Sequence, residues 1–374
     1  MSGKRFARLV VVGVIGSMMV LAGPAAAQEA PVLGQAQRVA LLTGPGSINA
    51  TDVRYQVNAT DLGIIWGTGR GQVLVAFGDT FGTGWTGPGP GVGDQATIDW
   101  RSQTLARSAD TDLADGMSFD SFATDRPGHA AELIPSQKIN GVEISTIPTG
   151  GVSIGGRDYL AYMSVRRFGP GGGRWTTNHA GVAYSDDNGQ TWVEAISARR
   201  PNTPASDDPF QMVAYAQQDG FVYLFGTPNG RFGDAHLARV PPQDLLDQRA
   251  YQYWTGEDWQ PGAAQLAVPI VPGPVGELSV HYNSALNAWT MMYLDESQGA
   301  IVLRAAPQPT GPWGPAVAVA TAEEYPALYG GFIHPYSDGA ELYFTMTQYW
   351  AYNVSLMRVR LTPDLLDSLL PADS

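Results

Sequence analysis

Two aspartates, Asp61 and Asp79, are the residues of this sequence best placed to do chemistry together. Asp61 precedes the apolar segment 62–66, and Asp79 follows the apolar segment 73–77 after one glycine. The segment 67–71 between them reads Gly-Thr-Gly-Arg-Gly, which predicts a turn. A regular hairpin would therefore bring both carboxyl groups to the same end of one sheet. Two facing acids repel, which raises the pKa of one and suits an acid–base pair. The alternative interpretation is two ordinary turn-capping aspartates.

The sequence lacks the residues or motifs that most other kinds of catalytic site require. The chain has no cysteine, which excludes thiol nucleophiles, cysteine-ligated metals and disulfides. The histidines lack the spacing of a zinc site and stand at positions 129, 179, 236, 281 and 334. We find no phosphate-binding loop, dinucleotide fingerprint or serine nucleophile elbow. The remaining equipment, carboxylates among glycines and aromatic rings, is typical of a glycosidase without metal or cofactor.

Several other residues are candidates for holding a sugar. Aromatic rings could stack on sugar faces, although a place in the core is the alternative for each. Arg101 could bind a hydroxyl group or instead brace two strands through an ion pair. For the acids the alternative is a solvated turn, and for the histidine a structural role. The predicted substrate-binding residues are Trp100, Arg101, Trp175, Asp208 (or its neighbour at 207), Glu277, His334, Tyr349 and Trp350.

A recurring strand pair indicates how these residues are positioned. A turn followed by an apolar strand occurs five times, at 71–77, 156–165, 219–226, 287–294 and 338–346. A second short strand follows each copy, at 103–107, 181–185, 236–240, 301–305 and 355–361. Five such units predict an all-β fold, a five-bladed β-propeller. Two packed β-sandwich domains are the alternative.

Local motifs agree with this architecture. The segment 185–192, Ser-Asp-Asp-Asn-Gly-Gln-Thr-Trp, has the pattern of an Asp-box hairpin, a structural turn of propeller blades. Short helices are predicted at 241–247 and 363–370, both beginning near proline. The glycine-rich segments 84–93 and 169–173 predict long loops, where binding sites on rigid scaffolds usually lie.

Composition and the N-terminus predict an exported protein. Basic residues, then an apolar run over 9–21 and the sequence Ala-Ala-Ala at 25–27, have the layout of a secretory signal peptide. We therefore expect a signal peptide at 1–27 and a single catalytic propeller domain at 28–374, secreted or held in the cell envelope. The formal net charge of −13 argues against nucleic acid and anionic membranes as partners. We expect a monomer that acts on a polysaccharide.

Two segments carry a family resemblance. Thr-Asp-Leu-Gly-Ile at 60–64 and Phe-Gly-Asp-Thr-Phe-Gly at 77–82 resemble the signature of secreted actinobacterial proteins of the domain of unknown function 4185. That family is similar to glycoside hydrolase family 183, the endo-D-arabinanases. Weaker matches lie at 100–102, 147–151, 162–165, 253–256, 276–280 and 331–335. The resemblance covers roughly residues 43–361. At position 103 this chain has glutamine, whereas the family resemblance predicts asparagine.

The resemblance implies a five-bladed propeller with catalytic aspartates at Asp61 and Asp79. It also implies cleavage within the D-arabinofuranose chains of mycobacterial arabinogalactan and lipoarabinomannan, with inversion. We expect Asp79 to be the acid, because Phe77 and Phe81 could desolvate it, and Asp61 to be the base. Two alternatives remain open: a non-catalytic glycan-binding propeller of the envelope, and a propeller glycosidase acting on L-arabinan or sialosides.

Overall fold

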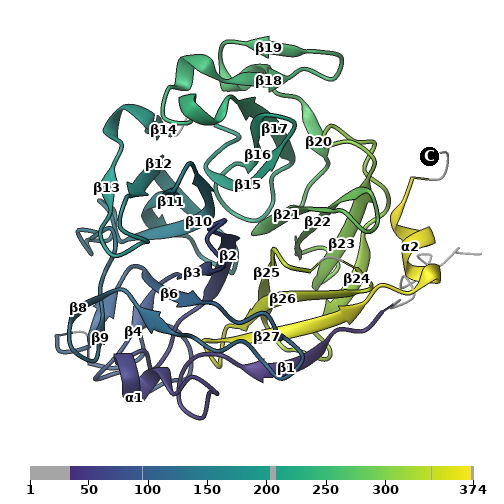
Figure 1. The fold of residues 1–374 in the computed structure, drawn as a ribbon. Helices are drawn as coiled ribbons and strands as arrows, with labels where there is room; N and C mark the ends of the chain where they lie inside the picture. Colours follow the sequence, from purple (N-terminus) through teal and green to yellow (C-terminus); the bar gives the residue numbers. More distant parts are fainter. Residues whose placement is uncertain (1–33, 95, 203–207, 338, 372–374) are drawn as a thin grey trace, which may run out of the picture. The chain divides into compact units, whose positions relative to one another are not determined.

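The protein is an all-β propeller of five blades, as the strand pattern predicts. A computed structural model describes residues 34–94, 96–202, 208–337 and 339–371; the predicted signal peptide lies outside them. Five antiparallel sheets follow one another around the ring in chain order (Figure 1). Their first strands pack against one another in the closed order β2, β10, β15, β21, β25 and back to β2. The ends of these strands therefore meet around one central space.

Each blade has the same plan of strands. The first strands are β2 (Leu62–Gly67), β10 (Ser145–Ile154), β15 (Met212–Gln218), β21 (Leu278–Asn283) and β25 (Leu328–Ile333). The second are β3 (Val73–Phe77), β11 (Arg157–Phe168), β16 (Phe221–Thr227), β22 (Ala288–Asp295) and β26 (Glu341–Gln348). The third are β6 (Thr104–Ser108), β12 (Trp175–Ser185), β17 (Ala235–Val240), β23 (Ala300–Ala306) and β27 (Asn353–Arg360). The five predicted strand pairs are the second and third strands of the five blades.

The outer strands are shorter and more varied. They are β7 (Ser121–Phe122), β13 (Val193–Glu194), β18 (Gln252–Trp254), β24 (Val317–Thr321) and β1 (Gln37–Leu41). Additional pairings come from β14 (Arg200–Pro201), β19 (Trp259–Pro261), β20 (Pro269–Val271), β4 (Thr80–Phe81) with β5 (Trp100–Arg101), and β8 (Thr124–Arg126) with β9 (His129–Ala130). Because β1 pairs with β27, the last blade is completed by a strand from near the start of the described chain.

The helices and the Asp-box agree with the sequence in most respects. The C-terminal helix α2 spans Pro363–Leu369, and Thr362 caps it by accepting from the Leu365 amide. The other helix is α1 (Thr51–Tyr55), while the segment predicted as a helix at 241–247 forms only a 3₁₀ turn over Pro242–Asp244. No helix of the described chain is long and apolar enough to cross a membrane. In the Asp-box, Asp187 accepts from the Thr191 hydroxyl and amide, which confirms a structural turn.

Candidate active site

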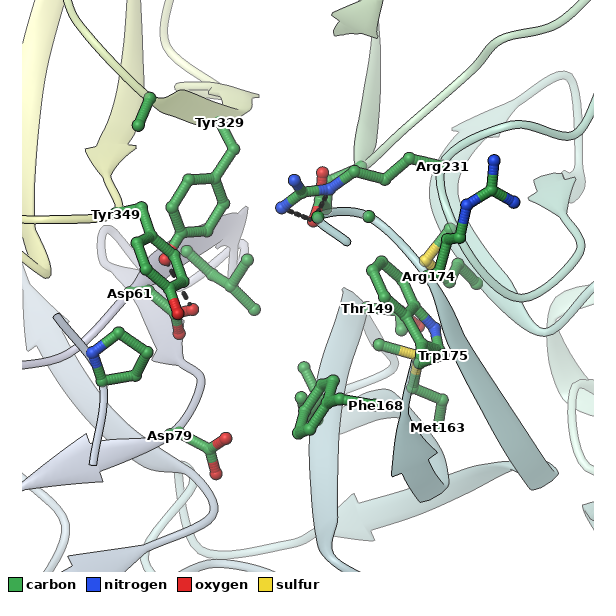
Figure 2. Close-up of a pocket in the computed structure, with 18 of the residues that line it drawn as sticks. Asp61, Asp79, Thr149, Met163, Phe168, Arg174, Trp175, Arg231, Tyr329 and Tyr349 are labelled. Carbon is green, nitrogen blue, oxygen red and sulfur yellow. Dashed lines mark hydrogen bonds and ion pairs between the residues drawn. The ribbon is translucent and has the colours of Figure 1, made fainter. Parts of the chain in front are cut away.

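A cavity of about 740 Å³ lies where the first strands of the blades meet. This volume falls within the range of ligand-binding pockets. Every blade contributes to its lining, for example Asp61, Ile147, Met212, Leu278 and Tyr329. Figure 2 shows two facing walls, with Asp61 and Asp79 on one side and Phe168, Trp175 and Arg231 on the other. The cavity thus brings together residues that are far apart in the sequence.

The hairpin β2–β3 places both aspartates at the cavity, as predicted, but with an altered register. Leu62 pairs with Phe77, whereas Ile64 pairs with Ala76, so a bulge lies at Gly63. Asp61 therefore lies beside Gly78 rather than opposite Asp79. A Cβ atom at Gly78 would overlap Asp61 Oδ1. Only glycine leaves room there for the Asp61 carboxyl group.

Asp61 has few hydrogen-bond partners for its carboxyl group. The Tyr329 hydroxyl donates to Oδ2 at 2.8 Å, while the buried Oδ1 has no hydrogen-bond partner among the described residues. Burial, and secondly the charge of Asp79, raise the pKa of Asp61 to about 7, against the lowering effect of Tyr329. The repulsion falls on Asp61 because Asp79, having the lower pKa, ionises first. Near neutral pH, a substantial fraction of Asp61 is therefore still protonated.

Asp79 lies in a more polar environment. Its Oδ1 accepts from Ser145 Oγ at 2.6 Å and from Trp100 Nε1 at 2.8 Å. Burial raises the pKa of Asp79 to about 6, and these two donors oppose the rise. The order of the two pKa values is the reverse of the one expected from the aromatic neighbours of Asp79. One reason is that Phe77 packs into the apolar core with Phe119 instead of lining the cavity.

The facing wall carries a half-buried ion-pair triad. Arg231 Nη2 lies 2.8 Å from Glu277 Oε1, and Arg231 Nη1 lies 3.2 Å from Glu296 Oε1. The Arg231 guanidinium also lies over the rings of Trp175, at 5.8 Å, and Tyr329, at 4.9 Å. Because Tyr329 donates to Asp61, this cation is connected to the carboxyl pair through one aromatic ring. The wall is therefore polar and preorganised.

Three aromatic side chains on the cavity are unusually exposed. Phe168 is 49% exposed, Tyr349 is 42% exposed and Trp350 is 60% exposed. Phe168 ends β11, whereas Tyr349 and Trp350 form the turn between β26 and β27. Large apolar side chains left in contact with water around a cavity are typical of a ligand-binding surface. Stacking on sugar rings is one use that explains them.

Four of the eight predicted substrate-binding residues line the cavity. These are Trp175, Glu277, Tyr349 and Trp350. Trp100 does not line the cavity itself, but its indole N–H donates a hydrogen bond to Asp79, which does. The structure thus places five of the eight residues either on the cavity lining or in contact with the carboxyl pair.

The other three predicted residues lie away from the cavity. Arg101 is buried, pairs with Asp99 at 3.1 Å and donates to backbone carbonyls, which corresponds to the bracing role. Asp208 accepts from the Phe210 amide in a local turn. His334 is completely buried and accepts from the Tyr336 amide. A substrate-contact role for these three finds no support in their placement.

Other residues of the site were not predicted from the sequence. Tyr329, Arg231, Ser145 and Phe168 contact the carboxyl pair or line the cavity. Phe168 directly precedes the predicted glycine-rich loop at 169–173, and the position of that loop could have indicated that Phe168 belongs to the site. Within the described ranges, no three acidic or histidine side chains come together in a way that could hold a metal ion.

Comparison with known proteins identifies relatives of the whole propeller. The family model described as "Domain of unknown function (DUF4185)" matches residues 46–358. The notoamide biosynthesis cluster protein J′ of Aspergillus versicolor is 33% identical over 340 residues, which cover 86% of this chain and 87% of that protein. The corresponding protein J of an Aspergillus strain is 34% identical over 315 residues, 79% of this chain and 81% of that protein.

Solved structures share the fold at low sequence identity. A putative hydrolase from Bacteroides ovatus superposes with a TM-score of 0.55 at 15% identity, covering 82% of this chain and 86% of that one. A family 117 glycoside hydrolase from the marine bacterium Zobellia galactanivorans superposes with a TM-score of 0.50 at 12% identity, covering 89% and 92%. Likeness at this level shows a common fold, and the chemistry must be argued from the site.

Proposed function

The chain belongs to the family described as domain of unknown function (DUF4185), and from this premise we propose that it is a glycoside hydrolase, an endo-D-arabinanase. The observation that carries the proposal is the pair of carboxyl groups, Asp61 and Asp79, whose pKa values are raised to about 7 and about 6 at one cavity. Glycosidic hydrolysis needs one protonated and one ionised carboxyl group. The resemblance of the segments around these residues to glycoside hydrolase family 183 supports D-arabinan as the substrate.

In this proposal Asp61 is the acid and Asp79 is the base. Asp61 has the higher pKa and gives its proton to the glycosidic oxygen as the C–O bond breaks. Asp79, whose carboxylate is stabilised by Ser145 and Trp100, accepts a proton from the water that attacks the anomeric carbon. The new C–O bond forms on the opposite face, so the configuration is inverted. These roles reverse our expectation from sequence, because the pKa order is reversed.

The charges of the cavity favour a neutral sugar over an anionic one. Acidic residues outnumber basic ones in the lining: Arg231 is paired with Glu277 and Glu296, and the carboxyl pair faces one further cation, Arg174. A sialoside would bring its own carboxylate next to these acids, which repel it. The structure of the cavity therefore supports arabinan over sialosides among the alternatives.

The exposed aromatic residues favour a polymeric substrate. Phe168 lies on one wall and Tyr349 on the facing wall, beside Asp61, so sugar rings could stack on both walls of the cavity (Figure 2). We expect a chain held between these rings to be cleaved internally, with release of oligosaccharides. Export through the predicted signal peptide would bring the enzyme to an envelope polysaccharide; N-terminal analysis of the mature protein from the culture medium tests this.

A digestion screen tests the proposal directly. Mycobacterial arabinogalactan should yield short arabino-oligosaccharides, whereas L-arabinan and sialosides should not be cleaved. Asp61→Asn and Asp79→Asn should each lower kcat by at least about 10²-fold while the protein remains folded. Binding of D-arabinan without any product would indicate a non-catalytic binding protein instead. Product NMR tests the stereochemistry: retention in the first-formed product would contradict attack by water.

A further inference from the structure

The ion pair between Arg231 and Glu277 has an unusual geometry. Both Nε and Nη2 of Arg231 donate to the same oxygen, Glu277 Oε1, at 2.9 and 2.8 Å. A fork that engaged both carboxylate oxygens would be the common arrangement. Here the second oxygen, Oε2, is buried and makes no hydrogen bond within the described residues, and only 12% of the side chain is exposed. Glu277 therefore keeps one free acceptor at the cavity.

A free donor lies on the same wall. Trp175 is 8% exposed, and its indole Nε1 is buried without a hydrogen-bond partner among the described residues. Both Trp175 and Glu277 contact one guanidinium, that of Arg231, and both line the cavity. An unpaired acceptor and an unpaired donor thus belong to two side chains that contact the same guanidinium, and Figure 2 shows Arg231 and Trp175 on the wall that faces Asp61 and Asp79.

Unpaired polar atoms of this kind suggest a missing ligand. Nearly all buried polar groups in folded proteins find a partner, so the unpaired atoms of three cavity-lining residues, Asp61 Oδ1, Glu277 Oε2 and Trp175 Nε1, call for an explanation. On the wall of Glu277 and Trp175, a ligand that satisfies both must donate to a carboxylate and accept from an indole N–H. A sugar hydroxyl group is both donor and acceptor, and vicinal hydroxyls present both functions side by side. An anionic group that carries no proton could not donate to Glu277 Oε2.

We infer that Glu277 and Trp175 form a recognition subsite for the free hydroxyl groups of one sugar ring, with Arg231 as the residue that positions it. The inference rests on the proposed function, because it concerns the same cavity and a neutral sugar. Arg231 holds Glu277 Oε1 and at the same time lies over the ring of Tyr329, the donor to Asp61. A ring bound at this subsite is consequently aligned with the proposed acid.

Calorimetric titration with arabinofuranosyl oligosaccharides tests the subsite without depending on turnover. The background is Asp79→Asn, so that the ligand stays intact. Glu277→Gln should weaken binding roughly 10- to 100-fold, since it removes a hydrogen bond to a charged group. Trp175→Phe keeps the ring and should weaken binding less, by about 10-fold. Matched controls outside the cavity are Glu194→Gln, which is paired with Arg199, and Trp192→Phe; both should bind as the background does.

Monodeoxy sugars make the test specific. One analogue, lacking the hydroxyl that meets Glu277, should bind more weakly than the parent sugar to the unaltered subsite, yet equally to the Glu277→Gln variant. Circular dichroism verifies that each variant is folded. Normal affinity in Glu277→Gln, or the same loss for every analogue in both proteins, would overturn the subsite. A dependence on Glu277 seen only with L-arabinofuranosyl ligands would keep the subsite but refute the proposed substrate. Absence of binding to any of these sugars would overturn both.

Discussion

Replacing Asp61 by asparagine should make the protein more stable at alkaline pH. Burial and the charge of Asp79 raise the pKa of Asp61 from 3.8 to about 7 in the folded protein. The folded state therefore binds this proton more tightly than the unfolded state does. The stabilisation is complete below about pH 4 and is lost as the pH rises towards 7. Asparagine keeps the shape of the side chain and accepts from Tyr329, but it never has to ionise.

The size of the effect follows from the two pKa values. A shift from 3.8 to about 7 corresponds to roughly 4 kcal/mol in the free energy of unfolding, at about 1.4 kcal/mol per pH unit. For Asp79, whose pKa is about 6, the same reasoning gives roughly 3 kcal/mol. These are upper values for the change between pH 4 and pH 8. The difference in stability between variant and wild type should grow through this interval and stay constant above it.

Thermal unfolding at half-unit steps from pH 4 to pH 8 measures the difference. Tm of Asp61→Asn relative to wild type should rise by several degrees across the series, and Tm of Asp79→Asn by less. Asp367→Asn, on the exposed face of α2, serves as the control for the loss of a surface carboxyl group. A pH-independent offset for Asp61→Asn would refute the reasoning, because Asp61 would then ionise as readily in the folded protein as in the unfolded chain.

Three further predictions concern activity. The pH profile of kcat/KM should be bell-shaped, with limbs near pH 6 (Asp79 ionised) and pH 7 (Asp61 protonated); constant activity from pH 5 to pH 8 would contradict the acid–base pair. Gly78→Ala should displace the Asp61 carboxyl group and lower kcat by about 10²-fold in a protein that circular dichroism shows to be folded, and unchanged kcat would argue against the close contact. Trp350→Ala should raise KM for long arabino-oligosaccharides about 5- to 10-fold, whereas Tyr336→Ala, which removes an exposed ring outside the cavity, should leave it unchanged. Equal KM values in these two variants would indicate that Trp350 does not hold the chain.

The fold could be predicted from the sequence because each blade is a local unit. The turn and apolar strand that recur five times are the second strands of the blades, and two of them, β3 and β22, are buried along their whole length. Buried strands of this kind give a strong pattern of β-branched and aromatic residues. The helix predicted at 241–247 failed because its apolar residues pack as a 3₁₀ turn at the edge of a blade.

The active site was predictable only where it is local. Asp61 and Asp79 share one hairpin, so their proximity followed from the turn between them, although the bulge at Gly63 changed their register. Arg231 and Tyr329 belong to the third and fifth blades and reach the carboxyl pair only through closure of the ring. No spacing in the sequence reports such contacts between blades.

The pairing of β1 with β27 also determines the order in which the protein can be assembled. Val354 donates to the Thr43 hydroxyl across 311 positions of the chain, so this seam is among the last contacts available during synthesis. The entropic cost of closing a loop increases with the number of residues in the loop, by about 0.6 kcal/mol for each doubling of its length. Tyr329 and Trp350 belong to the blade that the seam completes, so the cavity lacks part of its lining until this blade has formed. A circular permutant that carries β1 directly after β27 would turn the seam into a hairpin, and we expect it to refold faster with the same active site.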